Sequence, residues 1–250
     1  MRKWLATPLA LAGLLLVASG TARTVDSAQD LHEAVASQPA AVTEAAVTSG
    51  NGWSLLTSYN VYSINPNQQY TVTFESGAVA ERQAPYLLRA LHELNSLGVK
   101  LSIGGVETVE EGKCPPRGHI HFTERYRPLG KAGFSQGIPC HDTTNKSAWG
   151  GIVKIDSEYD DGSWTLPSYG RWNVNVHEML HALGMGHANS DRDGDGKVED
   201  FECPATSYGN TPIMCSPNGG YKTEANKGRL VGPDEEGIKT ALANFGKETP

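Results

Sequence analysis

Residues 177–187 read His177-Glu178-Met179-Leu180-His181-Ala182-Leu183-Gly184-Met185-Gly186-His187 and fit the pattern H-E-x-x-H-x-x-G-x-x-H at every specified position. His177 and His181 are about one helical turn apart, so both rings project on one face of a helix and can bind one metal ion. Gly184 stands where the helix has to end and the chain has to bend sharply, a conformation that glycine adopts readily. That bend can bring His187 back as a third nitrogen ligand. Three protein ligands leave a fourth position for water, which is the arrangement of a catalytic zinc site.

Glu178 follows the first of these histidines but points to a different side of the helix. It can therefore reach a zinc-bound water without being a ligand, and we expect it to act as the general base. The alternative is a surface helix with incidental histidines, because H-E-x-x-H alone also arises by chance. The additional matches at Gly184 and His187 lower that chance roughly several hundredfold.

Hydrophobic patterns elsewhere predict a mixed set of strands and helices. Apolar residues at helical spacing predict a helix that opens at Pro85, a second that starts near Tyr169 and runs through His181, and a third that opens at Pro233. The stretch 187–230 is rich in Gly, Asn and Pro and should be mostly loop. This order suggests an α/β or α+β sheet with helices on one side. The predicted strands include residues 70–74, 99–103, 120–122, 131–136 and 151–155.

A second motif, Thr211-Pro212-Ile213-Met214, ends 27 residues after His187. With the histidine segment, it resembles the metzincin family of zinc peptidases, in which a Met-turn follows the extended zinc motif. The resemblance covers roughly residues 65–246. It implies a twisted mixed sheet with an active-site helix, a long irregular loop region and a C-terminal helix. It also implies a zinc-dependent endopeptidase in which Met214 forms an apolar floor beneath the zinc histidines.

Within this family, the chain is most similar to matrixin-type or small bacterial secreted members. The segment Gly232-Pro233-Asp234-Glu235-Glu236-Gly237-Ile238 is similar to the start of the last matrixin helix. Two departures limit the resemblance. No cysteine precedes Cys114, which excludes latency through a pro-peptide cysteine. Ser216 stands where some metzincins have a tyrosine, which excludes a zinc-binding tyrosine at that place.

An acidic segment between His187 and the Met-turn predicts a calcium site. Residues 191–202 match the calcium loop D-x-[DN]-x-[DN]-G-x5-E. The expected ligands are the carboxylates of Asp191, Asp193, Asp195 and Glu202, together with the backbone carbonyl of Lys197. The flanks leave no room for an entering helix, so we expect a lone structural calcium loop that makes the long loop rigid. The alternative is an acidic, solvated loop without an ion.

The amino-terminal residues predict export. A positive start, a short apolar run and a small-residue stretch make residues 1–22 a signal peptide. Residues 23–51 are a possible pro-segment or flexible arm, and residues 52–250 the metallopeptidase catalytic domain. The formal net charge of -7 becomes -9 when Arg2 and Lys3 are removed with the signal peptide. We expect a secreted, extracellular protein that acts on a protein or peptide substrate, without nucleic acid or membrane as a partner.

The four cysteines predict two disulfides in an exported protein. Three pairings are possible. We favour Cys114 with Cys140 and Cys203 with Cys215, because each pair closes a short local loop. A four-cysteine zinc site is the competing interpretation, but no C-x-x-C spacing supports it.

Further residues are candidates for substrate binding. We expect an extended substrate to pair with an edge strand at 131–136 or 147–153, and residues 216–221 to form a pocket wall. The sequence does not select between Tyr208 and Tyr221 as an extra donor to the oxyanion. Two other functions remain open: a secreted, non-enzymatic metal-binding module, and a zinc hydrolase that acts on a non-peptide bond.

Overall fold

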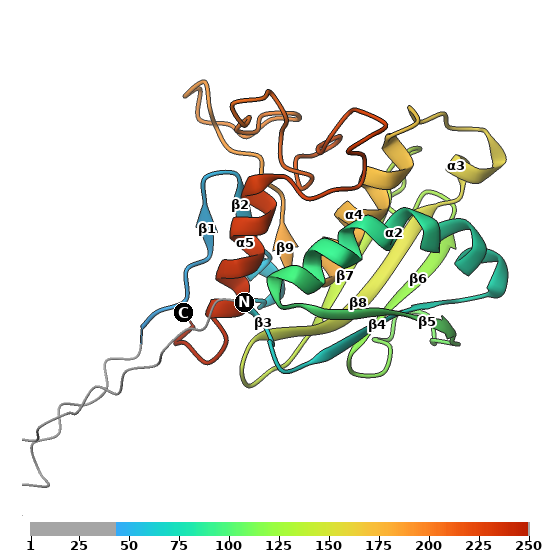
Figure 1. The fold of residues 1–250 in the computed structure, drawn as a ribbon, viewed down its shortest axis with the longest axis horizontal. Helices are drawn as coiled ribbons and strands as arrows, with labels where there is room; N and C mark the ends of the chain where they lie inside the picture. Colours follow the sequence, from blue (N-terminus) through green and yellow to red (C-terminus); the bar gives the residue numbers. More distant parts are fainter. Residues whose placement is uncertain (1–43, 250) are drawn as a thin grey trace, which may run out of the picture. The chain divides into compact units, whose positions relative to one another are not determined.

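The computed structural model describes residues 44–249, so the predicted signal peptide and residues 23–43 lie outside the described part. A six-stranded sheet carries α2 (Gly77–Leu97) and α4 (Gly170–Ala182) on the same face (Figure 1). A three-stranded antiparallel sheet lies beside the C-terminal helix α5 (Gly232–Ala243). Most of the chain between α4 and α5 is irregular loop. The predicted fold class, an α+β structure with a mixed sheet, a long loop region and a C-terminal helix, is confirmed.

All pairs in the six-stranded sheet are parallel except the pair of β7 with β8. The order is β3-β8-β6-β4-β5, and β7 pairs with β8 outside this path. The predicted strand 131–136 is wrong, because residues 131–135 are irregular and strand β7 begins only at Gln136. Within residues 44–249, β7 pairs with β8 alone, so its other edge is free of strand partners. The bounds are β3 Ser63–Ile64, β4 Gln69–Phe74, β5 Lys100–Val106, β6 His119–Arg125, β7 Gln136–His141 and β8 Ser147–Asp156.

Helix α2 begins before the position that the sequence pattern indicates. The prediction that Pro85 opens this helix is wrong, because Pro85 lies inside it. The hydroxyl of Ser76 accepts the backbone N–H of Val79 at 3.2 Å and caps the helix there. The predicted apolar stripe is confirmed at Leu87 and Leu94, which are fully buried against the sheet.

The small sheet joins the amino-terminal part of the domain to the loop after α4. It consists of β1 (Ser49–Gly50), β2 (Trp53–Leu55) and β9 (Met185–Gly186), in that order. Upstream of β1, the backbone N–H of Ala46 donates to the carbonyl of Glu248 at 2.8 Å. Residues 44–51, which the sequence assigned to a pro-segment or arm, are therefore part of this folded unit.

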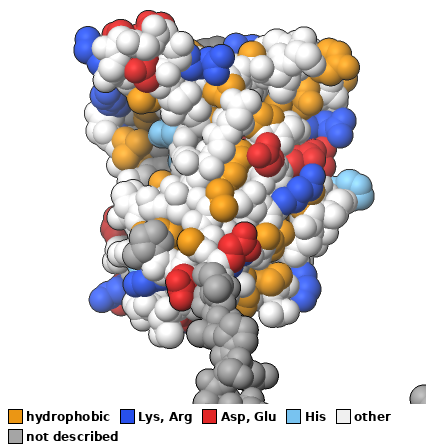
Figure 2. Space-filling view, turned by 90° about the vertical axis from the view of Figure 1, so that its left-hand side faces the viewer, with side chains coloured by type: hydrophobic (Ala, Val, Ile, Leu, Met, Phe, Trp, Pro, Cys, Tyr) orange, Lys and Arg blue, Asp and Glu red, His pale blue; other side chains and the backbone are white. Residues whose placement is uncertain are grey.

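Two disulfides join the cysteines as predicted, Cys114 with Cys140 and Cys203 with Cys215. Such bonds persist in oxidising compartments and are consistent with an extracellular protein. None of the helices within residues 44–249 is long and apolar enough to span a bilayer. On the face drawn in Figure 2, acidic and basic side chains are interspersed.

The remaining helical elements are short. They are a 3-10 turn, η1 (Thr57–Tyr59), and the single-turn helix α3 (Glu158–Asp161) that follows β8. Helix α5 begins at Gly232, one residue before the predicted start at Pro233. Pro233 lies in its first turn. Its predicted buried stripe is present at Ile238 and Ala241.

Candidate metal centre

Helix α4 and the turn after it bring the three predicted histidines together. One ring nitrogen from each of His177, His181 and His187 lies within 4.8 Å of the others. The helix ends at Ala182, and Gly184 follows with a φ of +92°. A Cβ at this position would also lie 2.3 Å from Cγ1 of Val61, so both the backbone angle and the space require glycine.

Backbone carbonyls fix the tautomer of two of these rings. Nδ1 of His177 donates to the carbonyl of Ile213 at 2.8 Å, and Nδ1 of His181 donates to the carbonyl of Met185 at 2.7 Å. A carbonyl can only accept, so each Nδ1 carries the hydrogen. Nε2 of a neutral ring is then left with a free lone pair. This second contact is typical of metal-binding histidines.

Burial keeps these rings neutral. It lowers the pKa of His177 to about 4 and that of His181 well below the ordinary value. The pKa of His187 is also lowered by desolvation. Nε2 of His181 lies 3.1 Å from Nε2 of His187. Neutral imidazoles with converging lone pairs fit a metal ion, so this triad can hold one.

The segment predicted as a Met-turn is hydrogen-bonded to the chain that carries the triad. Met214 is fully buried, and its carbonyl accepts the backbone N–H of Ala188 at 2.9 Å. The preceding residue, Ile213, supplies the carbonyl that holds His177. Residues 213 and 214 thus contact the first histidine and the residue that follows the last one. The disulfide of Cys215 with Cys203 ties this turn to the loop after β9.

Sequence reasoning did not find the support that Asp234 gives to this turn. This fully buried carboxylate accepts the backbone N–H groups of Ile213 at 2.8 Å, Met214 at 3.2 Å and Val231 at 2.9 Å. The available signal was an acid after Pro233, which indicates the positive end of a helix. Nothing in that local pattern indicates a partner so far away in the sequence.

Glu178 lines the same cavity as the three histidines. Only 7% of this residue is exposed, and burial raises the pKa of its carboxyl to about 8, while the backbone N–H of Gly137 opposes that rise. A nearby cation favours the ionised form of a carboxyl, so a bound metal ion lowers this pKa. The site therefore combines a group that can carry a proton with a set of metal ligands.

The cavity has a volume of about 270 Å³ and is largely apolar. Of the predicted wall 216–221, Ser216 to Gly219 line it, whereas Tyr221 does not. Tyr208 is 90% exposed and is also absent from the lining. The structure thus brings neither tyrosine candidate to the site. The tyrosines that do line the cavity are Tyr59, Tyr159 and Tyr169.

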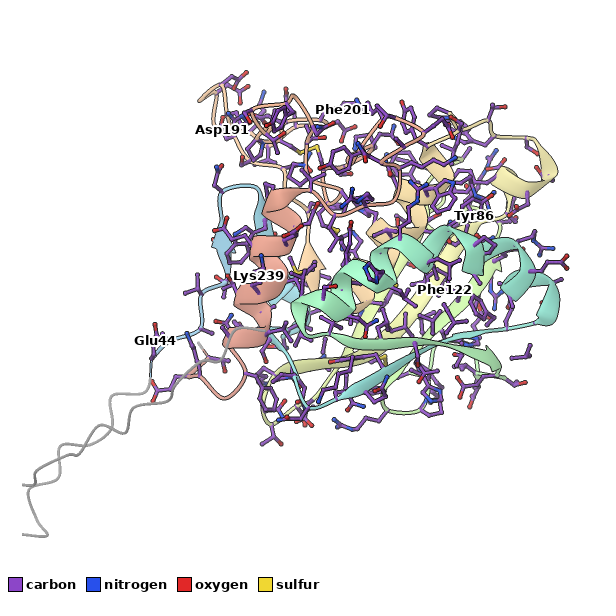
Figure 3. All side chains as sticks on the ribbon, viewed as in Figure 1. Glu44, Tyr86, Phe122, Asp191, Phe201 and Lys239 are labelled. Carbon is purple, nitrogen blue, oxygen red and sulfur yellow. A yellow bond between two sulfur atoms is a disulfide. The ribbon has the colours of Figure 1, made fainter. Side chains whose placement is uncertain are left out.

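Figure 3 labels Asp191 and Phe201 in the acidic loop, which lies away from α2. One carboxylate oxygen from each of Asp191, Asp193 and Asp195 lies within 4.8 Å of the others. Glu202 is not part of this group. The carboxylate of Glu202 instead accepts backbone N–H groups of the same loop, among them that of Glu199 at 2.9 Å.

No protein-family model matches this chain, and no curated protein sequence matches it. The assignment of the site therefore depends on the chemistry and geometry of its own residues.

Proposed function

We propose that this chain is a secreted, zinc-dependent endopeptidase of the metzincin type. The observation that supports this most is the position of buried Glu178 in the cavity where the rings of His177, His181 and His187 converge. Three histidines with an open position favour zinc over other common metals. The proposed secretion depends on the signal-like residues 1–22 and agrees with the two disulfides.

When bound, a zinc ion supplies a Lewis acid that polarises the scissile carbonyl and lowers the pKa of water. The protein supplies the proton transfers. The carboxylate of Glu178 takes a proton from the attacking water and passes it to the nitrogen of the leaving amine. His177 and His181 keep their orientation through the carbonyls of Ile213 and Met185, so no reorganisation is needed during the reaction.

Strand β7 is the proposed docking edge for the substrate. Its first residues, Gln136 and Gly137, line the cavity, and its outer edge has no strand partner within the described residues. An extended peptide can add to such an edge through backbone hydrogen bonds. Of the two edges expected from sequence, 131–136 overlaps β7 only at Gln136, and 147–153 belongs to β8, which has strands on both sides.

Of the two rival functions, only the non-enzymatic module makes no use of Glu178. A purely structural metal site has no use for a carboxylate beside its ligands, which argues against a non-enzymatic module. A non-peptide zinc hydrolase would use the same residues. Incubation of the zinc-loaded chain with an unfolded protein and with polysaccharides separates the two enzymes. We expect cleavage of the protein alone, lost on chelation and restored by zinc.

We also propose that the loop 191–202 binds calcium. The three converging aspartates support this, and all are exposed. Glu202 would have to exchange its backbone N–H partners for the ion to complete the ligand set of a calcium loop. A bound ion would stiffen the segment that follows His187.

A further inference from the structure

Strand β9 has only two residues, yet it lies between two of the proposed metal ligands. The carbonyl of Met185 accepts Nδ1–H of His181 at 2.7 Å. Gly186 is followed directly by His187. The position of this short strand therefore sets the orientation of one ligand and the starting point of another. Two residues cannot hold such a position alone, so the element that pairs with β9 determines it.

That element is β2. The register pairs Leu55 with Met185 and Ser54 with Gly186. Next to this pair, the backbone N–H of Leu56 donates to the carbonyl of Gly184 at 2.8 Å. β2 and the adjacent Leu56 therefore hold the backbone at the bend and directly after it, where the chain returns to the metal site.

The side chain of Ser54 extends this contact to the ligand itself. Its Oγ donates to the carbonyl of His187 at 2.8 Å. The approach is close, because a Cβ at Gly186 would lie 2.5 Å from the same Oγ. Glycine at position 186 thus leaves room for the hydroxyl to reach the third ligand.

The segment that carries β2 is anchored and is not a free arm. The backbone N–H of Leu55 donates to the carbonyl of Thr48 at 2.8 Å within the β1–β2 hairpin. Upstream, the buried side chain of Asn244 holds both polar groups of Val47. Its Oδ1 accepts the N–H at 3.1 Å, and its Nδ2 donates to the carbonyl at 2.7 Å. The hairpin is therefore fixed to the end of α5.

We propose that the amino-terminal hairpin is part of the metal centre, with Ser54 as a positioning residue for His187. Loss of a group that holds a ligand ring directly typically weakens metal binding 10–100-fold. Ser54 holds the backbone of the ligand instead, so we expect an effect at the lower end of this range. The inference depends on the metal-binding part of the proposed function and not on peptide hydrolysis. It also means that a processing cut within 44–53 would damage the site, so any pro-segment has to end before the hairpin.

The test compares the full wild-type chain with Ser54→Ala. Zinc affinity is measured by competition with a chromogenic chelator, and ligand geometry by the visible absorption of the cobalt-substituted protein. The melting temperature of the metal-free form is measured in parallel. Ser102→Ala is the matched control, because Ser102 lies on the distant strand β5 and also donates to a backbone carbonyl, that of Tyr70 on β4 at 3.4 Å.

We expect Ser54→Ala to weaken zinc binding about tenfold and to shift the cobalt bands, with an unchanged metal-free melting temperature. Ser102→Ala should match wild type in zinc affinity and in cobalt spectrum. Wild-type zinc affinity in Ser54→Ala overturns the inference. So does a lower metal-free melting temperature with an unshifted cobalt spectrum, which would make the role merely structural. A wild-type chain that binds no zinc overturns the metal assignment and this inference together, whereas a chain that binds zinc but cuts no peptide contradicts the proposed function alone.

Discussion

The carboxylate of Asp234 accepts a hydrogen bond of 2.8 Å from the backbone N–H of Ile213. The carbonyl of Ile213 in turn accepts Nδ1–H of His177 at 2.8 Å. A single residue of the turn therefore connects the first turn of α5 with the first proposed metal ligand. Because the carboxylate is fully buried, its position is set by these bonds and not by solvent.

Asp234→Asn should destabilise the domain and weaken metal binding. The amide has an NH2 group in place of one carboxylate oxygen, and that group would face backbone N–H donors. We expect the free energy of unfolding of the metal-free protein to fall by about 1–3 kcal/mol, as is usual when buried donors lose an acceptor. Urea denaturation measures this loss, and zinc competition measures the effect on His177.

Glu235→Gln is the control for Asp234→Asn. It changes the neighbouring acid of the same helical turn, whose contact is a 3.3 Å ion pair with Lys239 at the surface. Such pairs contribute little, so stability should change by no more than about 0.5 kcal/mol. Equal losses in the two variants would contradict a specific role for Asp234.

The contribution of His177 to the stability of the metal-free protein should be lost when the pH falls from neutral toward 4, whereas the raised pKa of Glu178 acts in the opposite direction. Burial lowers the pKa of His177 to about 4, below the ordinary value of 6.5 for an exposed histidine. The unfolded chain therefore binds a proton that the folded chain excludes. The stability that depends on the neutral ring is present above about pH 6.5 and is lost progressively below it. For His177 alone, the loss is roughly 3 kcal/mol by pH 4.

Thermal unfolding of the metal-free chain across this pH range measures the effect. His177→Asn removes the titrating group and leaves the buried acids in place, so the stability of wild type relative to this variant should fall as the pH is lowered from about 6.5 to 4. The same pH dependence in both proteins would show that other groups cause it.

Calcium should stabilise the zinc-loaded chain if the loop 191–202 binds it. At a concentration about a hundredfold above its Kd, a ligand adds roughly 2.7 kcal/mol. For a domain of this size, that corresponds to a rise of several degrees in melting temperature. Asp193→Ala should abolish the rise, because it removes one of the three converging side-chain oxygens, whereas the calcium-loop pattern accepts Asn at this position. A wild-type melting temperature that does not respond to calcium would count against the site.

The two disulfides should differ in their effect on the metal site. They span sequence separations of 26 residues for Cys114–Cys140 and 12 residues for Cys203–Cys215. Loop closure predicts a stabilisation of roughly 3 kcal/mol for each. Replacement of either pair by serines should therefore cost a similar amount in denaturant unfolding. Only loss of Cys203–Cys215 should also weaken zinc binding, because Cys215 is next to Met214. Equal zinc affinities in both double variants would contradict this account of the turn.

Local patterns in the sequence predicted much of the site. The spacing of His177 and His181 follows from helical geometry, and Gly184 marks the bend that returns His187. Both disulfides close short loops, which made their pairing predictable. These features share one property, since each depends on residues close together in the sequence.

Contacts between distant segments could not be predicted in this way. Ser54 and His187 are 133 positions apart in the sequence. No local pattern at either position indicates the other as its partner. The sequence pattern predicts the start of α2 too late, at Pro85, for a different reason. Proline favours the first turn of a helix, and this preference at Pro85 concealed the earlier cap at Ser76.

The most direct test compares wild type with Glu178→Gln in the hydrolysis of an unfolded protein, with the bound zinc of each chain counted. Glutamine keeps the volume of this buried side chain but cannot take up the proton. The account predicts one zinc per chain in both proteins and a rate at least about a hundredfold lower in the variant. Equal rates in the two zinc-loaded proteins, or no cleavage by zinc-loaded wild type even after removal of the residues before Glu44, would contradict it.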